Sequence, residues 1–341
     1  MDKVIQLGHG GGGILQSELI RLITETIRYR QVNQGVGIDA MDDGATIPLP
    51  QSDLDIVVTA DGHTVDPLSF PGGDLGSLAV SGTINDLLMM GAQPIALTSV
   101  VLVEEGLSLK VVKIIMDSFN DTANQAGVAI IAGDTKVMPH GSLKEMVLAT
   151  SGIGLKPKSR QILDSNCRFG AKIILTGTIG DHTASLLAHR DHLGIDPPLR
   201  SDITPLLPLY PLIEAFPRIY AMKDPTRGGI AAALNEWAEK SNVEILIDET
   251  KLVIPREVHA IADLYGLDPL EFANEGKALI CIDAQDADAF LAELHKTSIG
   301  THAQIIGEVG QTHPKFVILR TPLGGTRIIE KPMGELIPRI C

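Results

Sequence analysis

Aspartates recur next to the apolar segments of this chain, and this pattern restricts its fold more than any other feature. Asp61, Asp134 and Asp224 each lie just beyond an apolar run that is predicted to be a buried strand, and Asp86 lies inside an apolar helical pattern. An ionised carboxylate in such a place is costly unless a cation or hydrogen bonds compensate it. The pattern therefore favours a fold that supplies this compensation.

The acidic set favours a site for a metal ion and a nucleotide. Hard cations such as Mg²⁺ take oxygen ligands and commonly enter with substrate phosphates. For any one aspartate a turn or a helix cap is the simpler explanation, and only the whole set favours the metal site. The predicted Mg²⁺ ligands are Asp43, Asp61, Asp86, Asp134 and Asp224, and Asp42 lies beside Asp43 in an acidic turn.

The length of 341 residues suits two domains of ordinary size, with a predicted boundary in the polar stretch 156–170. The stretch 196–211 carries five prolines and is predicted to be a surface connection. Periodicity predicts helices over 14–28, 73–90, 109–126, 230–240, 255–265 and 284–296, and one that begins near Asp181. It predicts strands over 55–60, 95–103, 128–132, 147–154, 172–176, 219–223, 243–247, 278–282 and 303–309, and a short strand or extended entry over 4–7.

Composition and charge argue against several classes of function. The net charge is −14 with only 28 Lys and Arg, and no basic cluster is interleaved with aromatic residues, so neither nucleic acid nor a membrane surface is an expected partner. The longest apolar run, 95–103, is far shorter than the ~20 residues that cross a bilayer. No secretory signal pattern is present, and the three cysteines are odd in number and far apart, as expected for free thiols. A cytoplasmic location is expected.

A glycine-rich segment near the start of the chain is a candidate phosphate site. Gly10, Gly11 and Gly12 precede a predicted helix, so backbone N–H groups and the helix N-terminus are placed to hold phosphate. The segment also matches G-x-G-x-x-G, but the polar stretch 30–37 lacks the second strand and acid that a dinucleotide site needs. A flexible linker is the alternative interpretation.

A second glycine pair, Gly228-Gly229, opens a predicted helix, with Thr226 and Arg227 within reach of a phosphate. His63, just beyond a predicted strand, is a candidate contact for phosphate or metal. A hydrogen-bonded loop histidine is an equally good interpretation of that position.

Three side chains are candidate catalysts. Lys136 and Glu275 each lie in a predicted loop next to a strand, although either alone is more often a surface charge. Cys341 is the last residue of a Pro-rich tail, so its thiol has access and reach. Spacing alone does not separate a carrier thiol from an accidental terminal residue. Cys281, by contrast, is predicted to be a packed strand residue.

Together these residues resemble the HypE family of hydrogenase maturation factors, the carbamoyl dehydratases of the PurM-like ATP-binding superfamily. The resemblance covers essentially the whole chain. The aspartates and the Asp-Pro-Thr-Arg-Gly-Gly turn are shared across the superfamily, whereas the terminal Pro338-Arg339-Ile340-Cys341 is the specific mark. The matching segments are 8–13, 42–45, 61–65, 81–87, 133–137, 224–229 and 338–341.

The resemblance implies an α+β, two-domain PurM-like fold. A mixed sheet of domain A would form a barrel across a homodimer, domain B would be an α/β sandwich, and ATP would lie between the domains near the dimer seam. The implied divisions are a Gly-rich segment and helix over 1–40, an ATP-binding and dimerisation domain A over 41–155, domain B over 156–330, and a mobile tail over 331–341.

The resemblance also implies a reaction. Cys341 accepts a carbamoyl group from the partner HypF, and ATP with Mg²⁺ drives dehydration of the S-carboxamide to a thiocyanate. The cyano group passes to iron on a HypC–HypD complex as a ligand for [NiFe] hydrogenase. Glu275 is the implied base that removes the amide protons, and Lys136 orients or polarises the carboxamide. The implied contacts of ATP are Gly10, Gly11, Gly12, Asp43, Asp61, His63, Asp86, Asp134 and Thr226.

Two positions depart from the family pattern. Gly11 stands where a serine is common, which bears on a side-chain contact to phosphate, and Thr183 stands where glycine usually follows Gly-Asp-His. Two other functions stay open. Another ATP-dependent kinase or synthetase of the superfamily would not need Cys341, and a nucleotide-binding assembly scaffold would bind ATP without turning it over.

Overall fold

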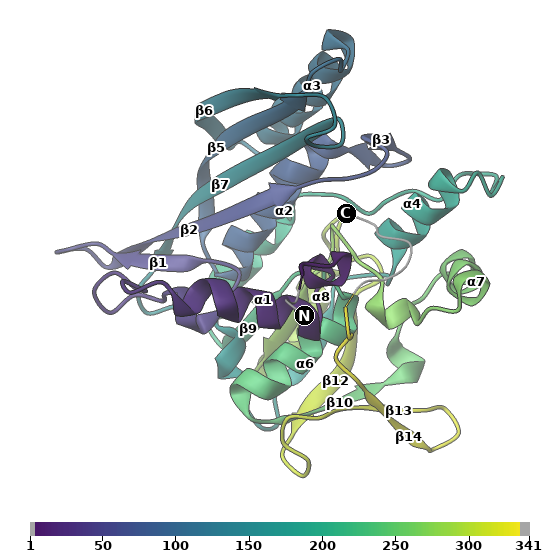
Figure 1. The fold of residues 1–341 in the computed structure, drawn as a ribbon. Coiled ribbons are helices and arrows are strands. Elements are labelled where there is room, and N and C mark those ends of the chain that lie inside the picture. The colour runs from purple at the N-terminus through teal and green to yellow at the C-terminus, as the bar shows by residue number, and fades with distance from the viewer. Residues whose placement is uncertain (1–3, 335–341) are drawn as a thin grey trace.

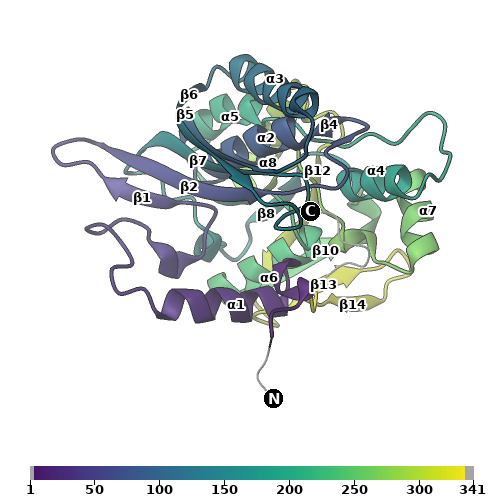
Figure 2. The same cartoon turned by 45° about the horizontal axis from the view of Figure 1, so that its top comes forward.

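Two mixed β-sheets with helices packed on them make up the computed structural model, which describes residues 4–334 (Figures 1 and 2). The N-terminal sheet contains β1 (Ala45–Pro48), β2 (Leu54–His63), β5 (Gln93–Glu104), β6 (Ala129–Met138) and β7 (Met146–Pro157), and a separate hairpin consists of β3 (Ser69–Phe70) and β4 (Gly73–Asp74). The order across the sheet is β1-β2-β7-β5-β6, and only the β5–β6 pair is parallel.

Helices α2 (Leu75–Met89) and α3 (Leu109–Gln125) pack against one face of the N-terminal sheet. The two helices approach closely because Gly76 has no side chain: a Cβ there would lie 2.2 Å from the Ile115 carbonyl oxygen. Among residues 4–334, no helix covers the opposite face of the sheet. Helix α2, whose small residues allow close packing, carries Asp86 and places it between this sheet and the second half of the molecule.

The C-terminal sheet contains β8 (Lys172–Leu175), β9 (Ile219–Lys223), β10 (Glu244–Asp248), β11 (Leu279–Ile282), β12 (Gln304–Gly310), β13 (Val317–Arg320) and β14 (Thr326–Ile329). Their order is β14-β13-β10-β12-β8-β11-β9, with β10 and β13 parallel. The helices of this half are α4 (Asp181–Arg190), α5 (Tyr210–Ala215), α6 (Gly229–Ser241), α7 (Arg256–Tyr265) and α8 (Ala284–Leu294). No helix within residues 4–334 is long and apolar enough to cross a membrane.

Strand β11 shows why the C-terminal sheet is covered on both faces. Leu279 and Cys281 pack into a cluster with α6, whereas Ile280 and Ile282 pack into the core that includes α8 and continues into the N-terminal half. All four residues are buried. A continuous apolar run is expected for a strand that is buried on both faces. The prediction that Cys281 is a packed strand residue is confirmed.

A buried ion network joins the two halves. Asp164, in a single 3₁₀ turn, accepts hydrogen bonds from Lys223 Nζ at 3.0 Å, Lys240 Nζ at 2.7 Å and Trp237 Nε1 at 2.7 Å. Lys223 also donates to Asp43 of the N-terminal half at 2.8 Å. Burial alone would raise the pKa of Asp164, but the two lysines hold it below its ordinary value.

Most of the predicted elements are confirmed, and one is wrong. Of the two alternatives for 4–7, no strand is present: residues 4–6 have no regular structure, Gln6 is extended, and Leu7–Gly10 forms a 3₁₀ helix that leads toward α1 (Ile14–Glu25). The strand expected over 128–132 continues as β6 to Met138, so Gly133 to Lys136 are not in a loop. The reason is tertiary pairing: β5 offers parallel partners as far as the pair Glu104–Met138.

Replacing Asp164 with alanine should lower the free energy of unfolding by about 3–5 kcal/mol, because the change removes the shared counter-charge of two lysines. Denaturant unfolding followed by circular dichroism measures this loss. Asp117→Ala is the control, since Asp117 pairs with Lys113 on an exposed helix surface and its loss should cost less than ~0.5 kcal/mol. A loss for Asp164→Ala no larger than for the control would contradict the proposed weight of this network.

Candidate functional site

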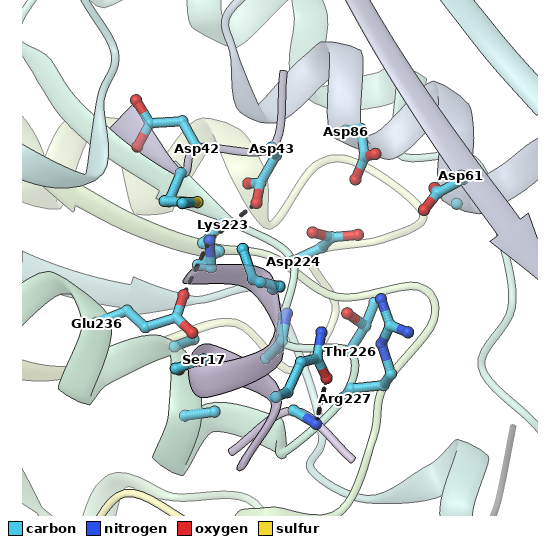
Figure 3. A pocket seen from close by; sticks show the side chains of 18 of the residues that line it. Ser17, Asp42, Asp43, Asp61, Asp86, Lys223, Asp224, Thr226, Arg227 and Glu236 are labelled. Carbon is cyan, nitrogen blue, oxygen red and sulfur yellow. Dashed lines mark hydrogen bonds and ion pairs between the residues drawn. The ribbon is translucent and has the colours of Figure 1, made fainter. Parts of the chain in front are cut away.

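A cavity of about 780 Å³ opens between the two halves of the molecule. Its walls come from the first turns of α1, the carboxyl end of β2, the middle of α2, the turn after β9 and one face of α6 (Figure 3). Because these elements belong to both halves, the cavity depends on their packing together.

Four of the predicted metal ligands line this cavity. Asp61 lies near the end of β2, Asp86 lies in α2, Asp43 comes shortly before β1, and Asp224 follows β9 directly. Figure 3 shows their carboxylates directed into the same space. Four separate elements supply them, so the fold and not local sequence brings these acids together.

Burial and repulsion from neighbouring carboxylates raise the pKa values of Asp43, Asp86 and Asp224. Burial, reinforced by the charge of Asp43, raises the pKa of Asp224 to about 8, and burial raises the pKa of Asp43 to about 6. The pKa of Asp86 is raised well above its usual range by burial and by the charge of Asp61, although Thr59 Oγ1 donates a hydrogen bond to its carboxylate at 2.7 Å. Acids that disfavour one another's ionisation in this way need a cation to be charged together.

The donor set fits Mg²⁺ entering with a nucleotide. All four side chains offer carboxylate oxygens, the ligands that Mg²⁺ prefers. Among residues 4–334, however, no three His, Cys, Asp or Glu side chains are gathered closely enough to hold a metal ion by themselves. Mg²⁺ usually keeps water and substrate phosphates in its coordination shell, so sparse protein ligands are consistent with a metal–nucleotide site.

Lys223 neutralises part of the negative charge at one side of the cavity. Its Nζ lies 2.8 Å from Asp43, 3.0 Å from Asp164 and 3.2 Å from Glu236. Burial lowers the pKa of this lysine, but the three carboxylates more than offset burial and raise it well above its usual range. Lys223 is therefore a charged lysine whose ammonium group is paired with these three acids. Sequence reasoning missed it, and its position directly before Asp224 was the only signal.

His63 closes β2 and forms part of the cavity wall. Its Nε2 lies 3.1 Å from Thr150 Oγ1 and 3.4 Å from Thr83 Oγ1. The side chain is buried, and burial lowers the pKa of the imidazole even though Asp61 lies nearby. These contacts suit a neutral, hydrogen-bonded histidine. Its contact with ATP stays a prediction.

Glu275 precedes β11 and faces the cavity. Its backbone N–H donates to Asp202 Oδ1 at 3.1 Å, and its carbonyl accepts from Asn85 Nδ2 at 3.4 Å. Burial, reinforced by the charges of Asp224 and Asp202, raises the pKa of its carboxyl well above the usual range. A carboxylate with a raised pKa and a fixed backbone has the properties of a general base.

The turn after β9 brings Thr226 and Arg227 to the cavity. Gly229 allows this turn to pack tightly, because its φ is +60° and a Cβ there would lie 2.5 Å from the Leu270 carbonyl oxygen. The positive charge of Arg227 partly offsets the rise that burial causes in the pKa of Glu275. This turn is therefore the cationic side of an acidic cavity.

The glycine-rich segment reaches the cavity only at its end. Gly12 lines the cavity, whereas Gly10 and Gly11 do not. Two of its N–H groups already have partners: that of Gly11 donates to the Gly8 carbonyl at 3.3 Å, and that of Gly12 donates to Oε1 of Gln16 in α1 at 2.6 Å. Phosphate binding by these glycines stays a prediction.

Asp134 and Lys136 lie on β6 and do not line the cavity. The cross-strand row that starts at Asp61 passes through β7 and β5 before it reaches β6 at Gly133. Three strand spacings of ~4.8 Å separate Asp61 from Gly133, a distance of about 14 Å. Asp134 and Lys136 therefore lie outside the cavity of their own chain, and their roles stay predictions.

Comparison with known proteins gives the family. The family model for AIR synthase related protein, N-terminal domain, matches residues 41–156, and the model for AIR synthase related protein, C-terminal domain, matches residues 168–320. The carbamoyl dehydratase HypE of Cupriavidus necator is 39% identical over 339 residues, which cover 99% of this chain and 95% of that protein. The chain belongs to the HypE family.

Solved HypE structures have the same fold. A chain of a HypE–HypF complex matches with a TM-score of 0.84 and 37% identity, covering 94% of this chain and 100% of that one. A HypE protein in complex with ATP matches with a TM-score of 0.81 and 34% identity, covering 99% and 100%. The two-domain PurM-like fold with mixed sheets is confirmed, and the barrel across a dimer stays a prediction.

The cavity of this HypE family member gathers most of the predicted site. The predicted residues that line it are Gly12, Asp43, Asp61, His63, Asp86, Asp224, Thr226 and Glu275. Those outside it are Gly10, Gly11, Asp134 and Lys136, and Cys341 lies outside the described residues. The charged residues that sequence reasoning did not assign to the site are Arg21, Lys223, Glu236, Glu239, Lys240 and Lys331.

With metal removed by EDTA, Asp224→Asn should be more stable than the wild type, and the difference should grow with pH. The unfolded pKa of an aspartate is ~3.9 and the folded pKa of Asp224 is about 8. Its stabilising contribution is therefore complete below the first value and is lost as pH rises to the second. Asparagine does not ionise, so its contribution to stability does not fall over this pH range.

Thermal unfolding at pH 5.5 and pH 8.5 tests this expectation. The unfolding midpoint of the variant should exceed that of the wild type by at least about 2 °C more at pH 8.5 than at pH 5.5. Asp191→Asn, outside the cavity, is the control and should show no such trend. A pH-independent difference for Asp224→Asn would show that repulsion in the cavity is not its cause.

Proposed function

We propose that this chain is an ATP-dependent carbamoyl dehydratase that converts the S-carboxamide on its own Cys341 into an S-cyanate. This product would be the source of the cyano ligand on the iron of [NiFe] hydrogenase. The observation that carries the proposal is Glu275, a buried carboxylate in an acid-lined cavity, in a chain that matches curated carbamoyl dehydratases over 99% of its length.

The chemistry explains the need for ATP. An amide oxygen is a poor leaving group until it is phosphorylated. In the proposed sequence the carboxamide oxygen takes the γ-phosphoryl group and ADP leaves; loss of the two N–H protons then forms the C≡N bond as the C–O bond to phosphate breaks. The products are the S-cyanate, ADP and inorganic phosphate, so the oxygen lost from the amide leaves in the phosphate.

Glu275 is the proposed base for the amide protons. Its carboxyl is buried at the cavity wall, and its raised pKa makes its carboxylate a stronger base than an exposed glutamate. Asp202 and Asn85 form hydrogen bonds with its backbone, so the loop that carries this carboxylate is fixed at the cavity wall. Arg227, on the opposite turn, would stabilise negative charge on the transferred phosphoryl group.

The proposed ligands of Mg²⁺ within one chain are Asp43, Asp61, Asp86 and Asp224. Bound there with ATP, the ion would neutralise the triphosphate and polarise the transferred phosphoryl group. Thr226 follows Asp224 in the cavity wall and would contact phosphate. Burial raises the pKa values of Asp86 and Asp224, and repulsion from neighbouring carboxylates reinforces both rises. This supports the assignment, because a bound cation would offset that repulsion.

We propose a homodimer in which the second copy completes the site. The uncovered face of the N-terminal sheet carries apolar side chains of β5, among them Val100, which is 36% exposed, and the half-buried Leu102, whereas Val101 between them packs into the core. Such residues on a sheet face favour burial against a partner. In the β5–β6 register Asp134 lies beside Val100 and Lys136 beside Leu102, so a second copy packed on this face would bring its Lys136 toward the first copy's cavity.

Two further partners follow from the proposed reaction. A structure of a HypE–HypF complex supports HypF as the partner that loads the carbamoyl group on Cys341. A HypC–HypD complex is proposed to accept the cyano group. Two other functions have less support: a different superfamily kinase or synthetase does not account for relatives named carbamoyl dehydratase, and a scaffold does not account for a buried base.

Glu275→Gln should keep the carbamoyl adduct and block its dehydration, because glutamine cannot accept the amide protons. Full-length protein carbamoylated at Cys341 is mixed with Mg-ATP, and the C-terminal peptide is weighed by mass spectrometry. The wild-type adduct should lose one water while ADP forms. The rate for Glu275→Gln should fall at least about 100-fold.

Glu271→Gln is the matched control, since Glu271 lies four residues earlier and does not line the cavity. It should dehydrate the adduct at the wild-type rate, and Cys341→Ala should form no adduct at all. Normal dehydration by Glu275→Gln would refute its role. A wild-type adduct that stays unchanged while ATP is hydrolysed would refute the proposed function itself.

Mixing two inactive variants tests whether Lys136 acts across a dimer. Lys136→Ala keeps Glu275 in its own cavity and can receive Lys136 from a Glu275→Gln copy. Random exchange of subunits should therefore restore about one quarter of the wild-type sites. A mixture that stays inactive, although size-exclusion chromatography shows that dimers have formed, would place Lys136 and Glu275 in one chain.

A further inference from the structure

The start of the C-terminal tail is bound to the first turn of α1 at the mouth of the cavity. We call residues 331–334 the tail root. Ile14 N–H donates to the Pro332 carbonyl at 3.0 Å, and Leu15 N–H donates to the Met333 carbonyl at 3.2 Å. These N–H groups belong to the first turn, which has no acceptors within its own helix. The tail root therefore satisfies donors that would otherwise need water or a ligand.

Glycine is required where this contact forms. A Cβ on Gly13 would lie 2.1 Å from the Pro332 carbonyl oxygen, and a Cβ on Gly12, whose φ is +80°, would lie 2.5 Å from the Arg227 carbonyl oxygen. Real side chains do not tolerate either distance. Residues 8–13, which we call the glycine turn, thus form a layer of bare backbone between the tail root and the turn after β9.

The other contacts of the tail root direct it toward the cavity. Lys331 lines the cavity, and its Nζ lies 3.3 Å from Glu239 Oε2 on α6. At the other end, a Cβ on Gly334 would lie 3.2 Å from the Gly8 carbonyl oxygen, which again indicates close backbone packing. The tail root is therefore held along its length, by α6 at its start and by the glycine turn at its end.

We propose that the glycine turn and the first turn of α1 form a bracket that positions the tail root for self-dehydration. Ile14, Leu15 and Gly13 are its positioning residues. The inference rests on the proposed function, because it concerns how the thiol of Cys341 is presented to Glu275.

Chain length gives the size of the expected effect. From the bracket, residues 335–341 span at most about 25 Å. Without it the free segment would begin at residue 330, directly after β14. The effective concentration of a tethered group falls roughly as the −3/2 power of tether length, so release of the bracket should dilute the thiol at the cavity at least about twofold.

Phosphate binding is the competing role for the same donors. A helix N-terminus after glycines is also the arrangement that holds phosphate, as the sequence pattern predicted. The two roles differ in kinetics. A positioning contact acts on the bound enzyme and changes the dehydration rate at saturating ATP, whereas a phosphate contact changes the ATP concentration needed for half the maximal rate.

Ile14→Pro removes one bracket hydrogen bond at little cost to α1. Proline is favoured at the first position of a helix, and Gly13 before it is extended, the conformation that a residue before proline prefers. Ile14→Ala is the matched control, because it trims the same side chain and keeps the N–H. Gly13→Ala is a second variant that displaces the Pro332 carbonyl without changing any donor.

Each full-length protein is carbamoylated at Cys341 by HypF and mixed with Mg-ATP at several concentrations, and dehydration is followed by the mass of the C-terminal peptide. Ile14→Pro and Gly13→Ala should lower the rate at saturating ATP at least about twofold and leave the half-saturating ATP concentration unchanged. Ile14→Ala should match the wild type.

Three outcomes would overturn the bracket. The first is a raised half-saturating ATP concentration with an unchanged maximal rate, which would make these donors phosphate ligands. The second is an equal loss in Ile14→Pro and Ile14→Ala, which would assign the effect to the side chain. The third is a dehydration rate at saturating ATP that is unchanged in both Ile14→Pro and Gly13→Ala.

Amide hydrogen exchange separates this inference from the proposed function. In the absence of ATP and of any carbamoyl group, the Leu15 amide should exchange at least about tenfold faster in Gly13→Ala than in Ile14→Ala, because only the first displaces the tail root. Equal exchange in the two variants would refute the bracket. The two proposals can therefore fail separately. If the Leu15 amide exchanges faster in Gly13→Ala but the wild-type protein does not dehydrate its carbamoyl adduct, the bracket is supported and the dehydratase function is refuted.

Discussion

A single buried lysine, Lys223, determines how negative charge is balanced between the two halves. It binds Asp43 and Asp164 and so closes the junction on one side of the cavity. The next residue, Asp224, turns toward Asp61 and Asp86, where burial and repulsion raise the pKa of Asp224 to about 8 (Figure 3). On one side of the cavity Lys223 offsets the charge of the acids that join the halves, and on the other side buried carboxylates disfavour one another's ionisation. The same packing that joins the halves thus creates the site.

Glu275 is held by residues that have no part in the reaction. Asp202 accepts hydrogen bonds from the backbone N–H groups of Glu275 and Gly276 and from Lys277 Nζ, and Asn85 bridges the Glu275 carbonyl and the loop that contains Leu206. Asn85 precedes Asp86 in α2, so one helix supports both the base and a proposed metal ligand. A base that is fixed in this way cannot follow its substrate, and the substrate must be brought to it.

Local patterns predicted the elements well because their evidence is local. Apolar runs located β11, and small residues with helical spacing located α2. The failures share a non-local cause. Strand β6 extends past Ala132 because β5 pairs with it, and Lys223 reaches Asp43 across 180 positions of sequence. The candidate site shows the same difference between local and non-local information. The acids at strand ends could be listed from the sequence. No local pattern showed that β6 lies three strands from β2 or that the tail root contacts α1.

A substrate carried on the chain itself changes what a binding site has to provide. Affinity is replaced by effective concentration, which depends on where the tether begins and how long it is. An anchor close to the thiol would hinder transfer to other proteins, whereas the anchor at residues 331–334 precedes Cys341 by seven residues. Two neutral backbone hydrogen bonds, each contributing about 0.5–1.5 kcal/mol, position a tether without immobilising it. Because Gly12 packs directly on Arg227, the layer that holds the tail root also contacts the turn proposed to bind phosphate. Any side chain at Gly12 would force the glycine turn and that turn apart, because its Cβ would lie 2.5 Å from the Arg227 carbonyl oxygen.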